Sequence, residues 1–382
     1  MKILHICSYY NTSALYKHLF KSVSKLEGIK QIVYIPMAKG GNICPKDYGT
    51  VRSKTEDYEG VNHIYREAFN KNDRYIFSLK NKKIINNLEK NVDIESIDFI
   101  HAHSLFVNGK VAYELKRKKS IEYIVAVRAT DVDVFFEKMI HLRKIGINIM
   151  KEAKNIIFIS HNLKNIVLNK YVPTKYRKEI EEKSIVLPNG LDLFWLKNNQ
   201  KKQIGSKENL NLAYIGTLHK RKNIDKSIKV FEKLNDEGIK TKFRIIGGGP
   251  DRDEIYSYIK SSKYGDLCKI DQWLNSREEL LSVYKNSDIY IMPSIKETFG
   301  ISYLEAISQG TPIIYTRNDG VFGYFNEGEV GYSVNPDNIN EIYESIIKII
   351  ENYNEISKNC IIKSQKFNWD EIAKDYMRLY QS

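Results

Sequence analysis

The stretch MPSIKETFGISYLEAISQGTPII, residues 292–314, decides the fold of this chain. It begins with the apolar end of a strand, continues through a polar loop, and then forms an amphipathic helical pattern that ends near Gly310, before Pro312. Glu297 lies in the loop just ahead of the helix, and Glu305 lies inside the helix. A strand, a loop and a helix in this order are typical of parallel α/β sheets, whose ligands bind where strands end and helices begin.

The same alternation of short apolar runs and amphipathic helical segments continues along the whole chain. The strand-like runs of the first half are KILHIC, KQIVYIP, DFIHAH, YIVAVR, NIIFIS and KSIVLPNG, and those of the second half are NLAYIGT, KFRIIGGG, CKIDQWL, DIYIMPS, TPIIYT and VGYSV. Parallel sheets with crossover helices give this pattern, and 382 residues suffice for two domains. We therefore expect an α/β fold of two doubly wound, Rossmann-like domains.

A polar, Lys- and Asn-rich stretch after Pro188 marks the expected boundary between the domains. Near the end of the chain, FNWDEIAKDYMRLY is an amphipathic helix that we expect to fold back over the first domain. The expected parts are an N-terminal domain over 1–190, a linker over 191–209, a C-terminal domain over 210–365 and the returning helix over 366–382.

The composition excludes several classes of protein. Hydrophobic residues make up 42% of the chain and charged residues 28%, which is typical of a globular protein and argues against disorder. The four cysteines are scattered without metal-ligand spacing, so neither a disulfide framework nor a zinc site is indicated. The first residues are too polar for a signal peptide, and no apolar run approaches about 18 residues. We expect a cytoplasmic protein that does not span a membrane.

The net charge of +13 lies entirely in the first half of the chain. Residues 1–190 hold 33 Lys and Arg against 20 Asp and Glu, whereas residues 191–382 hold 27 of each kind. Nucleic acid, an anionic membrane surface or an anionic substrate would explain this, and so would a Lys-rich composition that only keeps the surface soluble. Interleaved aromatic residues, which a groove for nucleic acid needs, are missing. We expect peripheral attachment to an anionic inner-membrane surface through residues 110–178, which contain the run Lys116–Lys119 and a helical segment with Lys138, Arg143 and Lys144, and we expect no nucleic acid.

A strand-to-helix junction in the second half, YIGTLHKRKNIDKSI, has the features of a phosphate site. It turns at Gly216 and enters a helix with Lys220, Arg221 and Lys222 at its start. The amides at a helix N-terminus together with cations bind phosphate, although a solvated basic turn has the same sequence. The next junction, RIIGGGPDRDEI, is also glycine-rich, which by itself is weak evidence.

The two glutamates of the opening stretch restrict the ligand further. The amides of Phe299, Gly300 and Ile301 are expected at a helix N-terminus, where Gly300 allows an anion to approach the backbone. Carboxylates repel a phosphate, so Glu297 and Glu305 must contact neutral, hydroxyl-rich parts of the same ligand. A nucleotide-sugar has this layout, with hydroxyls on the transferred sugar, a diphosphate in the middle and hydroxyls on the ribose.

At this point the sequence resembles a known family. The order GTLHKRKN, IIGGGP and PSIKETFGISYLEAISQGTPII is similar to the second domain of retaining glycosyltransferases of family 4, which have the two-domain GT-B fold with a central cleft. DFIHAHS, FISHNLK and VLPNGLD agree with the first domain, so the resemblance covers essentially the whole chain. It implies a hexosyltransferase that moves a sugar, with retention, from a nucleotide-sugar, expected to be a UDP-sugar, to a glycan or lipid-linked acceptor. The expected pathway is cell-surface polysaccharide synthesis.

The resemblance also implies roles for single residues, with the acceptor in the N-terminal domain and the donor in the C-terminal domain. Glu297 would contact the donor sugar and Glu305 the ribose, while Lys222 and the amides near Gly300 would hold the diphosphate. His103, the second histidine of HAH, would lie near the sugar, unless it is a histidine buried under the sheet edge. The expected catalytic residues are Glu297, Lys222 and His103, the donor-binding residues Gly216, Thr217, Arg221, Lys222, Phe299, Gly300, Ile301 and Glu305, and the acceptor-side residues Arg128 and Asp131.

Three positions depart from the family pattern. Many relatives have arginine where this chain has Thr217, so Arg221 or Lys220 is expected to share phosphate binding. SYYNTSALY replaces the usual glycine-rich first loop, and Arg128 stands where many relatives have histidine. Asp131 begins a D-x-D pair, which in the other glycosyltransferase fold binds a metal ion. Because the basic helix start can supply the positive charge instead, we expect neither a metal ion nor a cofactor.

Two alternatives to a transferase remain at this stage. A nucleotide-sugar epimerase or hydrolase of the same fold would share the phosphate site, and a non-enzymatic basic binding protein would share the charge. The glutamate cluster argues against the second alternative. No well-placed nucleophile is evident, so the family resemblance suggests front-face attack by the acceptor.

Overall fold

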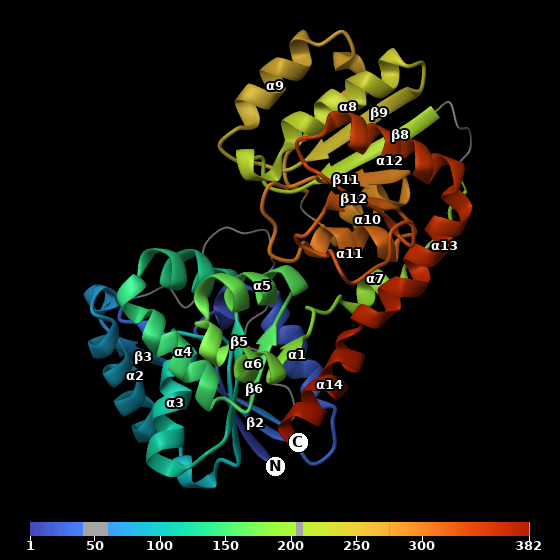
Figure 1. The fold of residues 1–382 in the computed structure, drawn as a ribbon. Helices are drawn as coiled ribbons and strands as arrows, with labels where there is room; N and C mark the ends of the chain where they lie inside the picture. Colours follow the sequence, from blue (N-terminus) through green and yellow to red (C-terminus); the bar gives the residue numbers. More distant parts are fainter. Residues whose placement is uncertain (41–59, 204–208, 275, 382) are drawn as a thin grey trace. The chain divides into compact units, whose positions relative to one another are not determined.

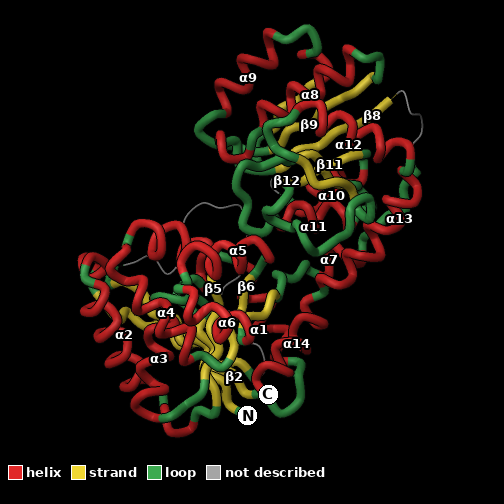
Figure 2. The backbone as a smooth tube through the Cα atoms, in the orientation of Figure 1, coloured by secondary structure: helices red, strands yellow, loops and turns green. Residues whose placement is uncertain are grey.

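The structure is a computed structural model that describes residues 1–40, 60–203, 209–274 and 276–381. The chain divides into two compact units. The first comprises Met1–Gly190 together with Trp369–Ser382, and the second comprises Leu191–Asn368. Each unit is a parallel sheet with helices packed on it (Figures 1 and 2).

The first unit has a seven-stranded parallel sheet in the order β3-β2-β1-β4-β5-β6-β7. All six runs predicted as strands in this half are strands. The seventh, β3, was missed because its sequence VNHIYREAF is polar and partly exposed, as expected at a sheet edge. The strands are β1 (Lys2–Ile6), β2 (Lys30–Ala38), β3 (Val61–Phe69), β4 (Phe99–Ala102), β5 (Tyr123–Val127), β6 (Asn155–Phe158) and β7 (Ser184–Val186).

The helices of the first unit connect these strands and cover the sheet (Figure 1). They are α1 (Ala14–Ser24), α2 (Phe77–Asn91), α3 (Val107–Lys119), α4 (Arg143–Glu152), α5 (His161–Ile166), α6 (Thr174–Glu182) and α14 (Trp369–Gln381). Shorter helical turns are η1 (Tyr10–Thr12), η2 (Lys71–Tyr75), η3 (Ile94–Ser96), η4 (Asp131–Phe136), η5 (Ile140–Leu142) and η6 (Val167–Tyr171).

The C-terminal helix α14 is part of the first unit, although the rest of the second unit separates it from that unit in sequence. Its apolar face joins the core that α1 forms with the sheet. At its start, Asp370 accepts a hydrogen bond of 2.7 Å from Ser22 Oγ and pairs with Lys25. Gly190 makes the close packing of Trp369 possible, because a Cβ there would lie 2.4 Å from the indole ring.

The second unit has a six-stranded parallel sheet in the order β10-β9-β8-β11-β12-β13, and all six predicted runs are strands. These are β8 (Asn209–Ile215), β9 (Lys240–Ile246), β10 (Cys268–Asp271), β11 (Ile289–Ile291), β12 (Ile313–Thr316) and β13 (Gly331–Val334). The helices are α7 (Leu193–Lys197), α8 (Ile224–Asp236), α9 (Arg252–Ser261), α10 (Arg277–Lys285), α11 (Ile301–Ser308), α12 (Ile339–Glu351) and α13 (Tyr353–Ser364), with the turns η7 (Lys220–Lys222), η8 (Gly265–Leu267) and η9 (Gln365–Phe367).

The stretch 191–209, expected to be a linker, contains the helix α7, and residues 204–208 within it lie outside the described part of the chain. Lys202 from this stretch is anchored in the second unit. Its Nζ donates to the carbonyls of Tyr284 and Ser287, both at 2.5 Å, and to Thr311 Oγ1 at 2.6 Å. The described part of this stretch therefore has fixed contacts with the second sheet.

The strand order reverses between β8 and β11 in the second unit and between β1 and β4 in the first. At such a point the connections leave in opposite directions, so the carboxyl ends of the two central strands are open to a ligand. The basic junction at 216–222 follows β8, and the loop 292–300 follows β11. The topology therefore brings the two sequence motifs of the second half together.

The basic run of the first unit is largely ion-paired. Lys116 pairs with Glu122 at 2.9 Å, and Lys118 and Lys119 pair with two glutamates of neighbouring elements. These pairs reduce the positive charge that the run presents to solvent. Within the described residues, no helix combines the length and the hydrophobicity that a membrane span requires.

Candidate active site

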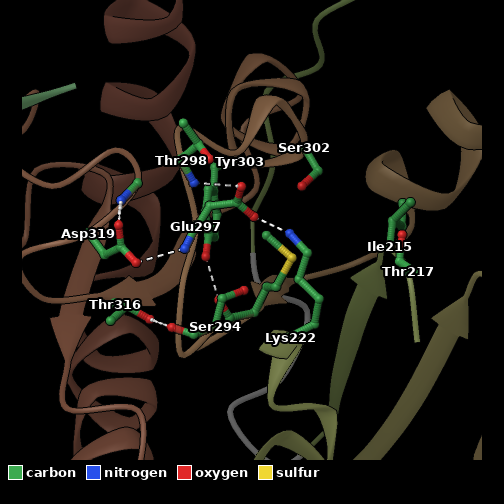
Figure 3. Close-up of polar contacts among 12 residues, drawn as sticks. Ile215, Thr217, Lys222, Ser294, Glu297, Thr298, Ser302, Tyr303, Thr316 and Asp319 are labelled. Atoms are coloured by element: carbon green, nitrogen blue, oxygen red, sulfur yellow. Dashed lines mark hydrogen bonds and ion pairs between the residues drawn. The ribbon is translucent and has the colours of Figure 1, made fainter. Parts of the chain in front are cut away.

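Glu297 and Lys222 form an ion pair between the loops that follow β11 and β8 (Figure 3). Lys222 Nζ donates to Glu297 Oε2, and Glu297 Oε1 accepts the amide of Thr298 at 3.0 Å. Both charged side chains are only 14% exposed. The two expected catalytic residues of the second half therefore lie in direct contact, with each carboxylate oxygen oriented by a partner.

Backbone contacts fix the turn η7, which carries Lys222. The amide of Arg221 donates to the His219 ring, and the Arg221 carbonyl accepts the amide of Ile295 at 2.8 Å. Asn223 adopts a left-handed conformation with φ of 56° and donates to the Pro293 carbonyl at 3.0 Å. The side chain of Arg221 itself is exposed. Tertiary contacts thus join the β8 and β11 loops independently of the Lys222–Glu297 pair.

The start of α11 requires a glycine at position 300. Gly300 has a φ of +84°, and a Cβ there would lie 2.4 Å from the ring of Tyr303. The side chain of Phe299 is buried against Tyr324, so only its backbone can face a ligand. The amides of Gly300 and Ile301 have no hydrogen-bond partner within the described residues, as is usual in the first turn of a helix. This helix start can accept an anion.

Glu305 lies about one helical turn after Ile301 on α11. Its carboxylate contacts a residue that the sequence did not indicate. Its Oε2 accepts a hydrogen bond of 3.0 Å from the hydroxyl of Tyr284 on α10. Burial raises the pKa of Glu305 to about 7, against the opposing effects of the Tyr284 hydrogen bond and the charge of Arg277. The second expected carboxylate is therefore close to its titration point near neutral pH.

The glycines after β8 and β9 allow the two strand ends to touch. The amide of Gly216 donates to the Ile246 carbonyl at 3.0 Å, and a Cβ on Gly247 would lie 1.9 Å from the Gly216 carbonyl oxygen. Thr217 is exposed at this edge, and its carbonyl accepts the hydroxyl of Tyr214 at 2.9 Å. These positions shape the backbone beside Lys222 and contribute no charge of their own.

His103 is buried in the first unit within a cluster of three histidines. His103 Nε2 lies 3.1 Å from His5 Nδ1, and His101 Nδ1 lies 2.9 Å from the hydroxyl of Tyr380. Burial lowers the pKa of all three histidines, so the rings are neutral at physiological pH. His101, which we expected to have a structural role, ties β4 to α14.

The ring nitrogens of this cluster lie within 4.8 Å of one another, a spacing that would suit a metal ion. However, no carboxylate belongs to the group, and the nearby charge of Arg128 further lowers the pKa of His101 and His103. An added divalent cation would share this buried space with a guanidinium. The electrostatics therefore disfavour a metal ion at the three histidines.

Asp131 is buried, and backbone amides occupy its carboxylate. Its oxygens accept the amides of Arg128 at 2.8 Å, Leu105 at 3.0 Å and Phe106 at 3.1 Å. Burial raises the pKa of Asp131 to about 6, and these hydrogen bonds oppose the rise. Arg128 Nε lies 3.3 Å from the His103 carbonyl oxygen, to which it donates. Asp131 and Arg128 thus organise the loops after β4 and β5, and their role toward an acceptor stays a prediction.

Sequence reasoning missed two residues that contact the predicted glutamates, namely Tyr284 and Asp319. Asp319 follows β12 in the sequence YTRNDG, and its carboxylate accepts the amide of Glu297 at 2.7 Å. A polar residue just after a strand could have been suspected, because ligands bind at strand ends. Nothing in the helical pattern of α10 distinguished Tyr284 from a core tyrosine.

Residues 197–367 match the protein family described as Glycosyl transferases group 1. The match lies within the second unit, Leu191–Asn368. This match decides the enzyme class, and the chain is a glycosyltransferase, as the sequence predicted. The matched residues include both Lys222 and Glu297.

Curated relatives of this glycosyltransferase match over about three quarters of their length. An uncharacterized glycosyltransferase of Methanocaldococcus jannaschii is 22% identical over 76% of this chain and 77% of its own. N-acetyl-alpha-D-glucosaminyl L-malate synthase of Bacillus anthracis is 23% identical over 75% of each chain. Alpha-monoglucosyldiacylglycerol synthase of Acholeplasma laidlawii is 24% identical over 74% of this chain and 75% of its own.

Solved structures confirm the predicted GT-B fold. The lipopolysaccharide outer core galactosyltransferase WaaB has a TM-score of 0.73 at 15% identity, covering 99% of both chains. Sucrose-phosphate synthase from Thermosynechococcus elongatus has a TM-score of 0.72 at 16% identity, covering 100% of this chain and 98% of its own. Anabaena HepE in complex with UDP has a TM-score of 0.67 at 15% identity, covering 99% of both chains.

Proposed function

We propose that the protein is a retaining hexosyltransferase that moves a sugar from a UDP-sugar to a glycan or lipid-linked acceptor in cell-surface polysaccharide synthesis. One observation carries the donor part of the proposal. Lys222 and Glu297 form a largely buried ion pair beside the open amides of Gly300 and Ile301, and Glu305 follows on the same helix. Lys222 and the two amides can bind a diphosphate. The two glutamates can bind the hydroxyls of the sugars on either side of that diphosphate.

The residues of this site can oppose the charges that develop in the transition state. Departure of UDP places negative charge on the diphosphate and positive charge on the anomeric carbon of the sugar. Lys222 and the amides at the start of α11 oppose the first charge, and they are already in place before the donor binds. The carboxylate of Glu297 is oriented to interact with the sugar, because Thr298 and Lys222 hold both of its oxygens.

The base and the acceptor are inferred from relatives. Anabaena HepE was solved with UDP and with UDP and glucose, which supports a UDP-sugar donor. The name of the Acholeplasma laidlawii relative denotes a lipid product, and WaaB is named for lipopolysaccharide, which supports a lipid-linked or cell-surface acceptor. We propose that the protein acts in the cytoplasm, at the inner face of the membrane.

A thermal-shift screen tests the donor first. UDP, ADP and GDP are compared, followed by UDP-glucose, UDP-galactose and UDP-N-acetylglucosamine, and we expect stabilisation by UDP and by one of its sugars. NMR then shows whether the product has the same anomeric configuration as the donor sugar. Rapid and complete turnover of the donor without an acceptor would favour an epimerase or hydrolase instead. An inverted anomer would contradict retention.

We also propose an attachment surface for anionic lipid on the first unit, away from the ion-paired run. Five large apolar side chains are exposed in η2, α2, η4 and η5, namely Tyr75, Ile76, Leu79, Val134 and Ile140. The segments meet at Phe77 and Phe135, whose ring centroids lie 6.0 Å apart. Exposed cations lie in or next to these segments: Lys71 and Arg74 in η2, Lys138 between η4 and η5, and Lys144 at the start of α4. Apolar side chains framed by cations suit the interface of an anionic bilayer.

A further inference from the structure

The loops that follow β11 and β12 are tied together at the residue that carries the predicted catalytic carboxylate (Figure 3). Asp319 Oδ2 accepts the amide of Glu297 at 2.7 Å, and the amide of Gly320 donates to the Glu297 carbonyl at 3.1 Å. One dipeptide therefore binds both backbone polar groups of Glu297. Nearby, Thr316 Oγ1 donates to the Ser294 carbonyl at 2.6 Å and extends the same junction.

The dipeptide Asp319–Gly320 packs closely against the loop that carries Glu297. Asp319 Oδ1 also accepts the Gly320 amide at 2.9 Å, so its carboxylate bridges the two loops. Gly320 has a φ of +55°, and a Cβ there would lie 3.2 Å from Glu297 Cγ and 3.2 Å from the Phe299 carbonyl oxygen. The backbone at position 320 thus packs directly against the stem of the Glu297 side chain.

We propose that Asp319 is a positioning residue for Glu297, which sets the direction of the carboxylate toward the transferred sugar. The inference rests on the proposed function in one respect, namely that Glu297 contacts that sugar. The start of α11 is held separately, by Phe299 in the core and by the Tyr303 hydroxyl on the Met292 carbonyl. Loss of the Asp319 carboxylate should therefore affect Glu297 more than the amides of α11.

A displaced catalytic group lowers turnover much more than it lowers affinity for the nucleotide. A misplacement of about 1 Å can cost about 10²-fold, so we expect Asp319→Ala to lower kcat by about 10- to 100-fold. The dissociation constant of UDP, which has no transferred sugar, should change by less than about 3-fold. Asp319→Asn keeps one acceptor for the Glu297 amide and should restore part of the lost turnover.

The matched control is Asp288. Its Oδ2 also accepts a backbone amide of another segment, that of Asn211 at 2.7 Å, but it lies before β11, at the end of the sheet opposite to Glu297. Asp288→Ala thus removes a bond of the same kind without touching the site. We expect it to leave kcat and UDP binding unchanged, although it can lower the melting temperature.

A double-mutant cycle separates positioning from an independent effect. The rate of UDP release is measured with UDP-glucose, UDP-galactose and UDP-N-acetylglucosamine for Glu297→Ala, Asp319→Ala and the double variant. If Asp319 acts through the carboxylate of Glu297, the double variant is no slower than Glu297→Ala alone. If the fold-losses in rate of the two single variants multiply in the double variant, the inference is wrong. It is also wrong if Asp319→Ala is as fast as the wild type.

Hydrogen exchange keeps this test independent of the proposed function. In Asp319→Ala the segment 295–300 should exchange faster than in the wild type, whereas in Asp288→Ala it should not. Unchanged exchange in Asp319→Ala would overturn the inference even if no donor is found. In contrast, full activity of Glu297→Ala, or no thermal stabilisation of the wild type by UDP or by any of the three donors, would count against the proposed function and leave the exchange experiment to decide on Asp319.

Discussion

The burial of Glu305 should make donor binding depend on pH. Burial raises the pKa of Glu305 to about 7, and the ionised form accepts ribose hydroxyls better than the neutral form does. The pKa is raised above its ordinary value, so the carboxylate is protonated below about pH 7 and ionises as the pH rises. The affinity for UDP-glucose should therefore increase between about pH 6 and 8. Isothermal titration calorimetry across this range measures the effect.

Tyr284→Phe removes the hydrogen bond that favours the ionised form of Glu305, so the pKa rises further and the gain in affinity moves to higher pH. The matched control is Tyr353→Phe, which removes another largely buried hydroxyl, one that donates to the Asp288 carbonyl at 3.1 Å. It should leave the pH profile in place. A Tyr284→Phe profile that coincides with the wild-type profile would show that this bond does not tune Glu305.

The ion pair of Lys222 and Glu297 allows activity and stability to be separated. Lys222→Met alone leaves a largely buried carboxylate without its cation, which should cost about 1–3 kcal/mol of unfolding free energy. It should also lower kcat by about 10²-fold, because a group that stabilises the leaving diphosphate is lost. Adding Glu297→Gln removes the unpaired charge. The double variant should regain much of the melting temperature and stay inactive, and recovered turnover would refute the assignment of both residues.

At the scale of the element, α11 depends on the turn at its first residue. Gly300→Ala places a methyl group 2.4 Å from the Tyr303 ring in a backbone of φ +84°, so the turn has to move. Because the amides of this turn are the proposed diphosphate site, both UDP affinity and kcat should fall, by about 10-fold or more. Gly238→Ala is the control, since it has a φ of +87° but nothing within 4 Å of the added Cβ. It should lose about 1 kcal/mol of stability and no activity.

The elements themselves could be predicted from the sequence because burial on both faces makes parallel strands continuous apolar runs. Twelve such runs are strands, and among the residues that the structure describes one further strand was missed, the polar edge strand β3. The two loops that carry the expected donor residues could be placed together too, since Glu297 and Lys222 follow strands that meet at the switch point. Their role toward a donor stays a prediction. Asp319 and Tyr284 could not, because they act through contacts between segments distant in sequence. The burial of His103 follows from its neighbours on β1 and α1, which no local pattern reveals.

At the scale of the whole molecule, the excess positive charge of the first unit does not act as one patch. The sequence placed membrane attachment within residues 110–178, with Lys116–Lys119 as one of two basic segments, and in the structure Lys118 is 3.0 Å from Glu89 and Lys119 is 2.5 Å from Glu95. Such surface pairs contribute little to stability, at most about 1 kcal/mol each, but they lower the local potential. In the described residues no carboxylate pairs with Lys138 or Lys144, which lie near exposed apolar side chains.

Attachment to a bilayer should therefore depend more on Ile76, Ile140, Lys138 and Lys144 than on the ion-paired run. Each cation near an anionic surface contributes about 1 kcal/mol, and each inserted aliphatic side chain adds an apolar contribution that salt does not screen. We expect the protein to co-sediment with vesicles rich in phosphatidylglycerol but not with pure phosphatidylcholine vesicles. About 0.5 M salt should weaken binding, since it shortens the screening length.

Three double variants locate the surface. Lys138→Glu with Lys144→Glu, or Ile76→Asn with Ile140→Asn, should abolish most sedimentation, whereas Lys118→Glu with Lys119→Glu reverses as many charges and should reduce it less. None of these residues belongs to the donor site, so UDP binding should be unchanged in all three and reports that the protein is folded. If the Lys118→Glu and Lys119→Glu variant loses more sedimentation than the other two variants, the attachment surface lies at the basic run instead. Equal sedimentation with neutral vesicles would contradict an electrostatic surface altogether, because the charges would then contribute nothing to binding.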